Sequence, residues 1–173
     1  MGSISEKTIT SYTVHAGDGD YGTVALELGE HSVTVMAESS FGTYGYHWSN
    51  TGSDPIGFLQ RIRIDYAMGK FRGEEYNVFD RAAQEKELKT RILQDRRQDT
   101  IDAEHAREMF DQISEVCEAY TVNEFKSNMY YSGALIRHIY DNDCSEVDAA
   151  TRPDPQCVGF WESIWRPLMA HLQ

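Results

Sequence analysis

The hydrophobic pattern of this chain changes its period near residue 53, and this change constrains the fold more than any other feature. Before it, Val24, Leu26 and Leu28 alternate with residues of the opposite face, which is the two-residue period of a half-buried strand. After it, Phe58 and Ile62 stand at the four-residue spacing of a helix face. Strands followed by helices are typical of an α+β fold.

Short turns separate the expected strands. A β-branched run covers residues 8–14, and glycine-containing turns follow at 16–20 and 29–31. An aromatic run at 39–52 would form the last strand. Because strands joined by short turns pair antiparallel, the sequence predicts an antiparallel β-meander of about four strands within residues 1–53.

Helical spacing dominates the remainder of the chain. Ser53 or Asp54 is a suitable N-cap for the first helix, Pro55 suits its first turn, and Gly69 suits its end. Pro167 should kink the last helix or end its first half. The expected helices are 55–69, 79–97, 100–120, 123–139 and 161–172.

These elements fit a single α+β domain of 173 residues, a length that allows one sizeable core. The four to five α-helices are expected on one face of the sheet. The domain would consist of the β-meander at 1–53, a helical part at 54–140, and a loop with a C-terminal helical tail at 141–173.

The charge of the chain excludes several classes of partner. It has 28 acidic and 16 basic residues, a net charge of −12. Such a chain should repel DNA, RNA and anionic membranes, so we expect no direct nucleic-acid binding and no membrane association. Cys117, Cys144 and Cys157 form no CxxC pair, and we interpret them as reduced thiols of a cytoplasmic protein.

An acidic row on the third expected helix is the strongest candidate binding site. Its carboxylates are spaced 4, 3, 4 and 3 residues apart, which places them on one helix face. They step by roughly 5 Å and span about 21 Å, not far from the spacing of phosphates along a nucleic-acid strand. The row could therefore occupy a basic groove of another protein; the alternative is an ordinary solvated helix face. The row consists of Glu104, Glu108, Asp111, Glu115 and Glu118.

Motifs for catalysis or metal binding are absent from the sequence. The run at 141–152 fails the EF-hand pattern, and no phosphate-binding loop or zinc-protease motif occurs. Two alternatives stay open: a metal site assembled from His47, His138 and a cysteine, or an acid–base pair of His47 with Asp54 or Asp65. We expect a non-enzymatic protein with no catalytic residues, no metal and no cofactor.

The aromatic run can be interpreted as a strand or as a site. Tyr44, Tyr46 and Trp48 should point to one face, which would pack under the helix that carries Phe58 and Leu59. The alternative is a pocket for a small ligand or a nucleotide.

A segment at 41–73 resembles one in small uncharacterised proteins encoded by bacteriophages and prophages. The shared pattern is an FG, aromatics ending in Tyr-x-Trp, a turn with Gly, then Phe-Leu and Asp-Tyr-x-x-Gly-Lys, over about a fifth of the chain. The matching residues are Phe41, Gly42, Tyr44, Tyr46, Trp48, Gly52, Phe58, Leu59, Asp65, Tyr66, Gly69 and Lys70.

The resemblance implies a phage protein in the cytoplasm of the host bacterial cell. Together with the acidic row, it suggests an anti-CRISPR-like inhibitor of a bacterial defence system. Its partner would be a host defence protein or nucleoprotein complex with a basic surface, approached as a nucleic-acid mimic. The alternatives are a ligand-binding protein, or an accessory protein acting as a homo-oligomer through the tail with Trp161 and Trp165.

Overall fold

The chain forms two compact units in the computed structural model, which describes residues 2–17 and 19–173. Unit 1 consists of Met1–Tyr76 and Pro153–Gln173, and unit 2 consists of Asn77–Arg152. Each unit has its own cluster of buried apolar side chains. The expected single domain with boundaries after residues 53 and 140 therefore differs from the observed division, in which unit 2 is inserted between two parts of unit 1.

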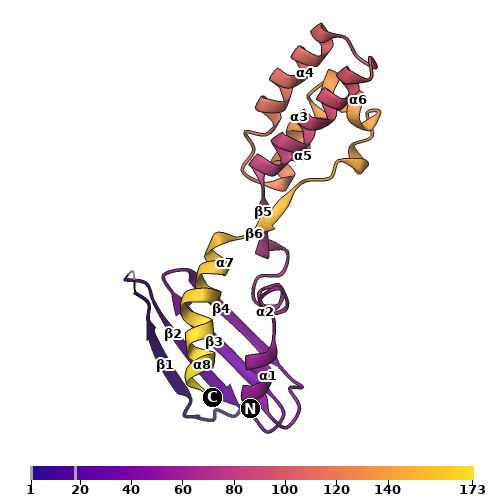
Figure 1. The fold of residues 1–173 in the computed structure, drawn as a ribbon. Coiled ribbons are helices and arrows are strands. Elements are labelled where there is room, and N and C mark those ends of the chain that lie inside the picture. The colour runs from indigo at the N-terminus through magenta and orange to yellow at the C-terminus, as the bar shows by residue number, and fades with distance from the viewer. Residues whose placement is uncertain (1, 18) are drawn as a thin grey trace. The chain divides into compact units, whose positions relative to one another are not determined.

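Unit 1 contains an antiparallel four-stranded sheet in the order β1-β2-β3-β4 (Figure 1). Its strands are β1 (Thr10–His15), β2 (Tyr21–Leu28), β3 (Val33–Ser39) and β4 (Gly42–Trp48). Val24 pairs with Ala37, and Leu26 pairs with Val35, so apolar side chains of neighbouring strands line the same face. The predicted α+β class and four-stranded meander are confirmed.

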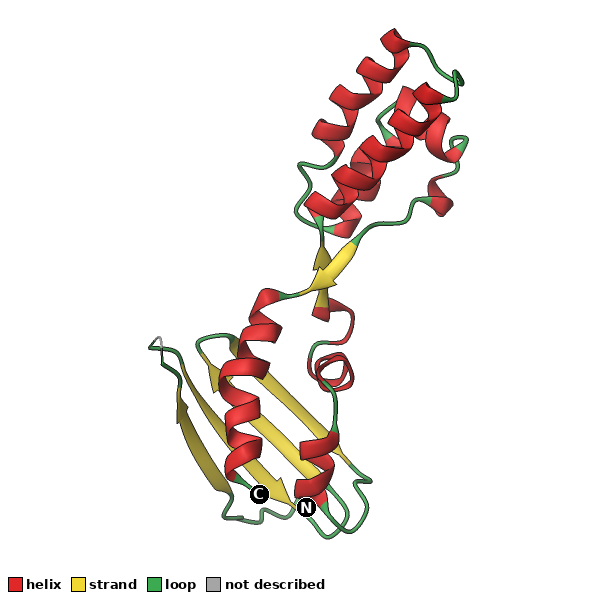
Figure 2. Cartoon of the chain, viewed as in Figure 1, coloured by secondary structure: helices red, strands yellow, loops and turns green. Residues whose placement is uncertain are grey.

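Helices cover one face of this sheet (Figure 2). They are α1 (Pro55–Arg61), α2 (Ile64–Phe71), η1 (Gly73–Tyr76), α7 (Pro155–Phe160), the π-helix η3 (Trp161–Trp165) and α8 (Arg166–His171). Asp54 caps α1 by accepting a hydrogen bond from the Gly57 N–H at 2.8 Å. The other helices of the chain share the separate core of unit 2, so only part of the helical half lies on the sheet.

The first expected helix is in fact two helices. Ile62 takes an extended conformation, with φ −66° and ψ 147°, and separates α1 from α2. Gly69 lies inside α2, and Gly73, with φ +59°, follows the C-cap Arg72. The prediction that Gly69 ends the helix was wrong, because Gly73 provides the left-handed residue that ends a helix at this position.

The C-terminal segment is helical on both sides of Pro167, so the proline does not end it, and the expected kink stays a prediction. The π-helix η3 lies immediately before Pro167, and the Arg166 N–H bonds to the Trp161 carbonyl five residues earlier. Proline lacks an N–H and its ring would clash with the carbonyl four residues before it in a regular helix. The wider π turn accommodates that ring, so the segment changes its hydrogen bonding at Pro167 without ending.

Unit 2 is helical, and the chain enters it through β5 and leaves it through β6, two strands that pair with each other. Its elements are β5 (Asn77–Phe79), α3 (Arg81–Arg97), α4 (Ala103–Val116), α5 (Val122–Tyr130), α6 (Ala134–Tyr140), η2 (Cys144–Glu146) and β6 (Thr151–Pro153). Asp80, Asp102 and Thr121 cap the first three α-helices through their side chains. The helix expected at 123–139 is divided by Gly133, which has φ +58°.

Candidate functional site

The acidic row lies on α4, a helix with two distinct faces. Met109, Ile113 and Val116 are buried and face the core of unit 2. At about 100° per residue, the acidic positions fall within roughly 80° of one another, centred roughly 150° away from these buried side chains. The row, called the acidic stripe below, is Glu104, Glu108, Asp111, Glu115 and Glu118.

The structure brings the five carboxylates of the acidic stripe together on one exposed surface. All five residues are exposed, and Glu118 extends the row just past the C-cap Cys117. Within residues 2–17 and 19–173, none of the five side chains takes part in a salt bridge. Their charges are therefore not neutralised by described neighbours and can act on a partner.

The first turn of α4 contains a hydrogen-bonded pair of Asp102 and His105. Asp102 accepts hydrogen bonds from the backbone N–H groups of Glu104 and His105, and its Oδ1 lies 2.9 Å from His105 Nδ1. The bond to Asp102 raises the pKa of His105, and the charges of Glu108 and Glu104 add to this effect. Protonation of His105 would place one positive charge beside the stripe.

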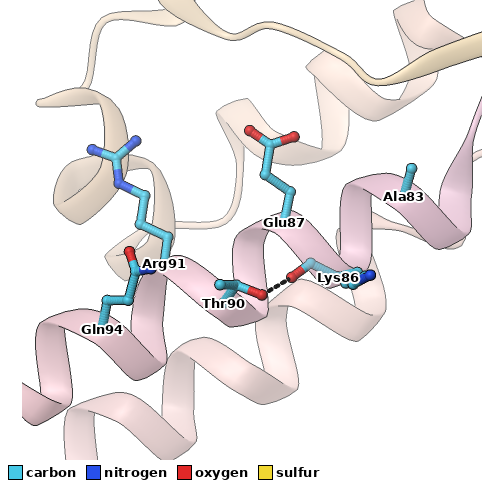
Figure 3. Close-up of a pocket in the computed structure, with 6 residues that line it drawn as sticks. All are labelled: Ala83, Lys86, Glu87, Thr90, Arg91 and Gln94. Atoms are coloured by element: carbon cyan, nitrogen blue, oxygen red, sulfur yellow. Dashed lines mark hydrogen bonds between the residues drawn. The ribbon is translucent and has the colours of Figure 1, made fainter.

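Helix α3, which packs against α4, has the opposite charge balance. It contains six basic and three acidic residues. A hollow of about 460 Å³ lies along this helix. Figure 3 shows the side chains that line it and the hydrogen bond that Thr90 donates to the Lys86 carbonyl, at 2.6 Å. All of the lining residues come from this one helix, so the hollow has no opposing wall to hold a ligand. They are Ala83, Lys86, Glu87, Thr90, Arg91 and Gln94.

The histidines considered for chemistry have other partners. His47 Nδ1 lies 2.9 Å from Thr34 Oγ1 in unit 1, and His138 Nε2 lies 2.8 Å from Asp95 Oδ2 in unit 2. Asp54 caps α1, and Asp65 accepts a hydrogen bond from the Tyr76 hydroxyl at 3.0 Å. The structure therefore does not bring His47 together with either aspartate.

The cysteines offer no metal-binding group in the described part of the chain. Cys117 and Cys157 are buried free thiols, and the side chain of Cys144 lies outside the described residues. Burial raises the pKa of Cys117 to about 11. Among the described residues, no group of three His, Cys, Asp or Glu side chains is arranged to hold a metal ion.

The aromatic strand β4 is part of the core of unit 1. Tyr44 stacks on Phe160 with ring centroids 4.1 Å apart, and Trp48 packs edge-on against Phe58 at 6.0 Å and Phe71 at 5.6 Å. Tyr44 and Trp48 are buried, so protein side chains occupy the space that a ligand would need.

The C-terminal tryptophans also belong to this core. Trp161 and Trp165 are buried and stack on one another with ring centroids 5.8 Å apart. They are therefore not an exposed surface for self-association.

Three exposed tyrosines of unit 2 were not among the candidate binding residues, and the helical spacing had placed one of them, Tyr120, with the apolar side chains of the third helix. Tyr120, Tyr130 and Tyr131 are 88%, 59% and 79% exposed. Exposed aromatic residues near a charged surface are common in protein interfaces. At about 100° per residue, Tyr130 and Tyr131 both fall roughly 100° or more away from the buried Phe125 and Met129, so helical periodicity could have predicted the exposure of this pair.

A comparison with known protein families shows which family the chain belongs to. The model of Phage_phiTE_072, a phage family, matches residues 2–172. The chain belongs to this family. The expectation of a phage-encoded protein is thus confirmed, whereas the aromatic motif within 41–73 stays a prediction.

Neither the curated proteins nor the solved structures contain a match to this chain. Across the described residues, no helix combines the length and apolar composition needed to cross a bilayer.

Proposed function

We propose that this member of the phage family is a non-enzymatic inhibitor of a bacterial defence system. In this proposal the acidic stripe on α4 docks onto a basic, nucleic-acid-binding surface of a host defence protein or nucleoprotein complex. The observation that carries the proposal is the row of five exposed carboxylates without described ion-pair partners. A charged surface of one sign increases the association rate and selects a partner of the opposite sign.

The stripe is unfavourable for the helix itself, which supports a role in binding. Like charges at three- and four-residue spacing destabilise a helix by a few tenths of a kcal/mol per pair. Arg107, which borders the stripe, makes no salt bridge in the described part of the chain. A purely solvated face would gain stability from mixed charges, as α3 does with its Glu85–Lys89 pair.

Charge reversal tests the proposal. Wild-type protein produced in a host with a defence system should restore plating of a sensitive phage, and should change nothing in a host without that system. The E108K/D111K/E115K variant should lose this activity and the co-purification of a defence component. A matched control, E6K/E38K/E74K, makes the same change in net charge at exposed acids elsewhere and should retain both.

Two results would contradict the proposal. One is full activity of the α4 variant with its fold intact by circular dichroism. The other is equal loss in both triple variants, which would show that total charge and not the stripe decides binding.

A further inference from the structure

A pocket beside the acidic stripe has the chemistry of a cation-binding site. It has a volume of about 290 Å³ and lies between α4 and the end of α5. This volume is at the lower limit for small-molecule pockets and suits one long side chain. Its lining residues are Gln112, Glu115, Val116, Asn128, Tyr131 and Ser132.

The residues that line the pocket include one charged, one aromatic and one apolar side chain. Glu115 belongs to the acidic stripe and has no described ion-pair partner. Tyr131 is 79% exposed and its ring packs edge-to-face with that of Tyr130, with centroids 4.9 Å apart, whereas Val116 is buried. A carboxylate and an aromatic ring favour a cation, and an apolar side chain favours an alkyl stem.

Hydrogen bonds hold the walls of the pocket in place. Helix α5 ends at Tyr130, and the Met129 carbonyl accepts the Ser132 N–H at 3.1 Å. Ser132 donates its hydroxyl hydrogen to the Met129 carbonyl at 2.7 Å. The Gln112 side-chain oxygen accepts from the Leu135 N–H at 3.0 Å, which holds that wall in place.

A guanidinium group fits these walls better than an ammonium group. It is planar, stacks on aromatic rings and donates paired hydrogen bonds to a carboxylate, whereas an ammonium is compact and more strongly hydrated. Tyr131 would contact the plane of the group, Glu115 would accept its hydrogen bonds, and Val116 would contact its methylene stem.

We propose that this pocket receives an arginine side chain of the basic partner and thereby fixes the register of the acidic stripe on it. This inference rests on the proposed function, because it requires a partner with a basic surface. The stripe would attract the partner over its whole length, and the pocket would select the position of one arginine.

Binding of short peptides to the full-length protein tests the pocket without the partner. The probe is N-acetyl-Gly-Arg-Gly-amide, followed by amide NMR shifts, and the matched probe replaces arginine with citrulline, which keeps the shape but has no charge. The arginine peptide should shift amides around Glu115, Tyr131 and Ser132 with millimolar affinity, and the citrulline peptide should bind at least about fivefold more weakly. A lysine peptide should also bind more weakly.

Matched variants separate the pocket from the general field of the stripe. E115Q and Y131A should each weaken the arginine peptide by about threefold or more. E104Q removes the same charge at the far end of the stripe and should have little effect. Equal effects of E104Q and E115Q, equal binding of the citrulline peptide, or shifts spread over the acidic surface would overturn the pocket proposal.

The outcomes for the two proposals are distinguishable. If E108K/D111K/E115K loses partner binding and the arginine peptide shows no localised binding, the acidic stripe is supported as a binding surface and the arginine pocket is contradicted. If the wild-type protein binds the arginine peptide at the pocket but has no anti-defence activity, the pocket is supported as an arginine site and the proposed function is contradicted.

Discussion

Asp102 and His105 form a pair at the start of α4, with the Oδ1 and Nδ1 atoms 2.9 Å apart. The same carboxylate oxygen accepts the His105 backbone N–H at 2.9 Å. It therefore caps the helix and also holds the imidazole ring in position. The two charged forms stabilise each other at the end of the acidic stripe.

We predict that His105 titrates above the ordinary histidine pKa. The hydrogen bond to Asp102 raises the pKa of His105, and the His105 backbone and side chain lower the pKa of Asp102. The D102N variant should move the His105 pKa down toward its ordinary value, whereas E108Q should lower it less. Imidazole resonances followed by NMR across pH 4 to 9 measure both effects, and a wild-type His105 pKa at or below the ordinary value would contradict the prediction.

The same shifts define a pH dependence of stability. Because the folded-state pKa of His105 is raised, its stabilising contribution is complete below the ordinary histidine pKa and is lost as the pH rises through the folded value. The lowered pKa of Asp102 contributes above the ordinary aspartate pKa and is lost as the pH falls through the folded value. Urea unfolding of wild type and D102N should therefore differ most between these two limits.

Two glycines are expected to respond oppositely to substitution by alanine. Gly133 has φ +58°, so G133A should strain the turn before α6 and lower the free energy of unfolding by about 1 kcal/mol or more. Gly69 lies inside α2 with open space around it, so G69A should raise the free energy of unfolding by about 0.5–1 kcal/mol. Chemical denaturation measures the free energy of unfolding of both variants. If both substitutions change it in the same direction, one of these backbone assignments is wrong.

Replacing one stripe residue with lysine should stabilise the protein. Asp111 stands three residues after Glu108 and four before Glu115, so D111K replaces two repulsions with two attractions. We expect a gain of about 0.5 kcal/mol at low salt that shrinks as salt is added. D111N is the control, because it removes the acid and its repulsions without adding the two attractions, and it should give a smaller gain. No difference between low and high salt would contradict the electrostatic explanation.

The buried thiols should be unreactive in the folded protein. Cys117 and Cys157 are almost fully inaccessible, and burial raises the pKa of each thiol. Iodoacetamide at pH 8 should modify both slowly in the native state and quickly in urea, because the thiolate is the reactive form. Peptide mass spectrometry measures each site separately, and rapid native labelling of Cys117 would show that the core of unit 2 opens readily.

Local periodicity was enough to predict much of the fold. The alternation of Val24 and Leu26 specified a half-buried strand, since a one-residue change of register would reverse its faces. The spacing of Met109 and Ile113 likewise specified which side of α4 is buried, and with it the opposite side that carries the stripe. The stripe as a row was therefore predictable, whereas its role as a binding site stays a prediction.

Contacts between distant residues decided what the sequence left open. Neither Ile62 nor the residues beside it include a glycine or proline, and Ile62 packs against the core of unit 1, so we attribute the break between α1 and α2 to tertiary packing. The exposure of the acidic stripe follows from the way α4 packs in unit 2.

The sequence by itself determined the α+β class, the β-meander and the two faces of α4, because these depend on residues a few positions apart. The tertiary structure decided the two units, the π turn before Pro167 and the pocket between Glu115 and Tyr131. Those features depend on which apolar surfaces meet across long stretches of chain, and the period of a single element contains no information about its partner.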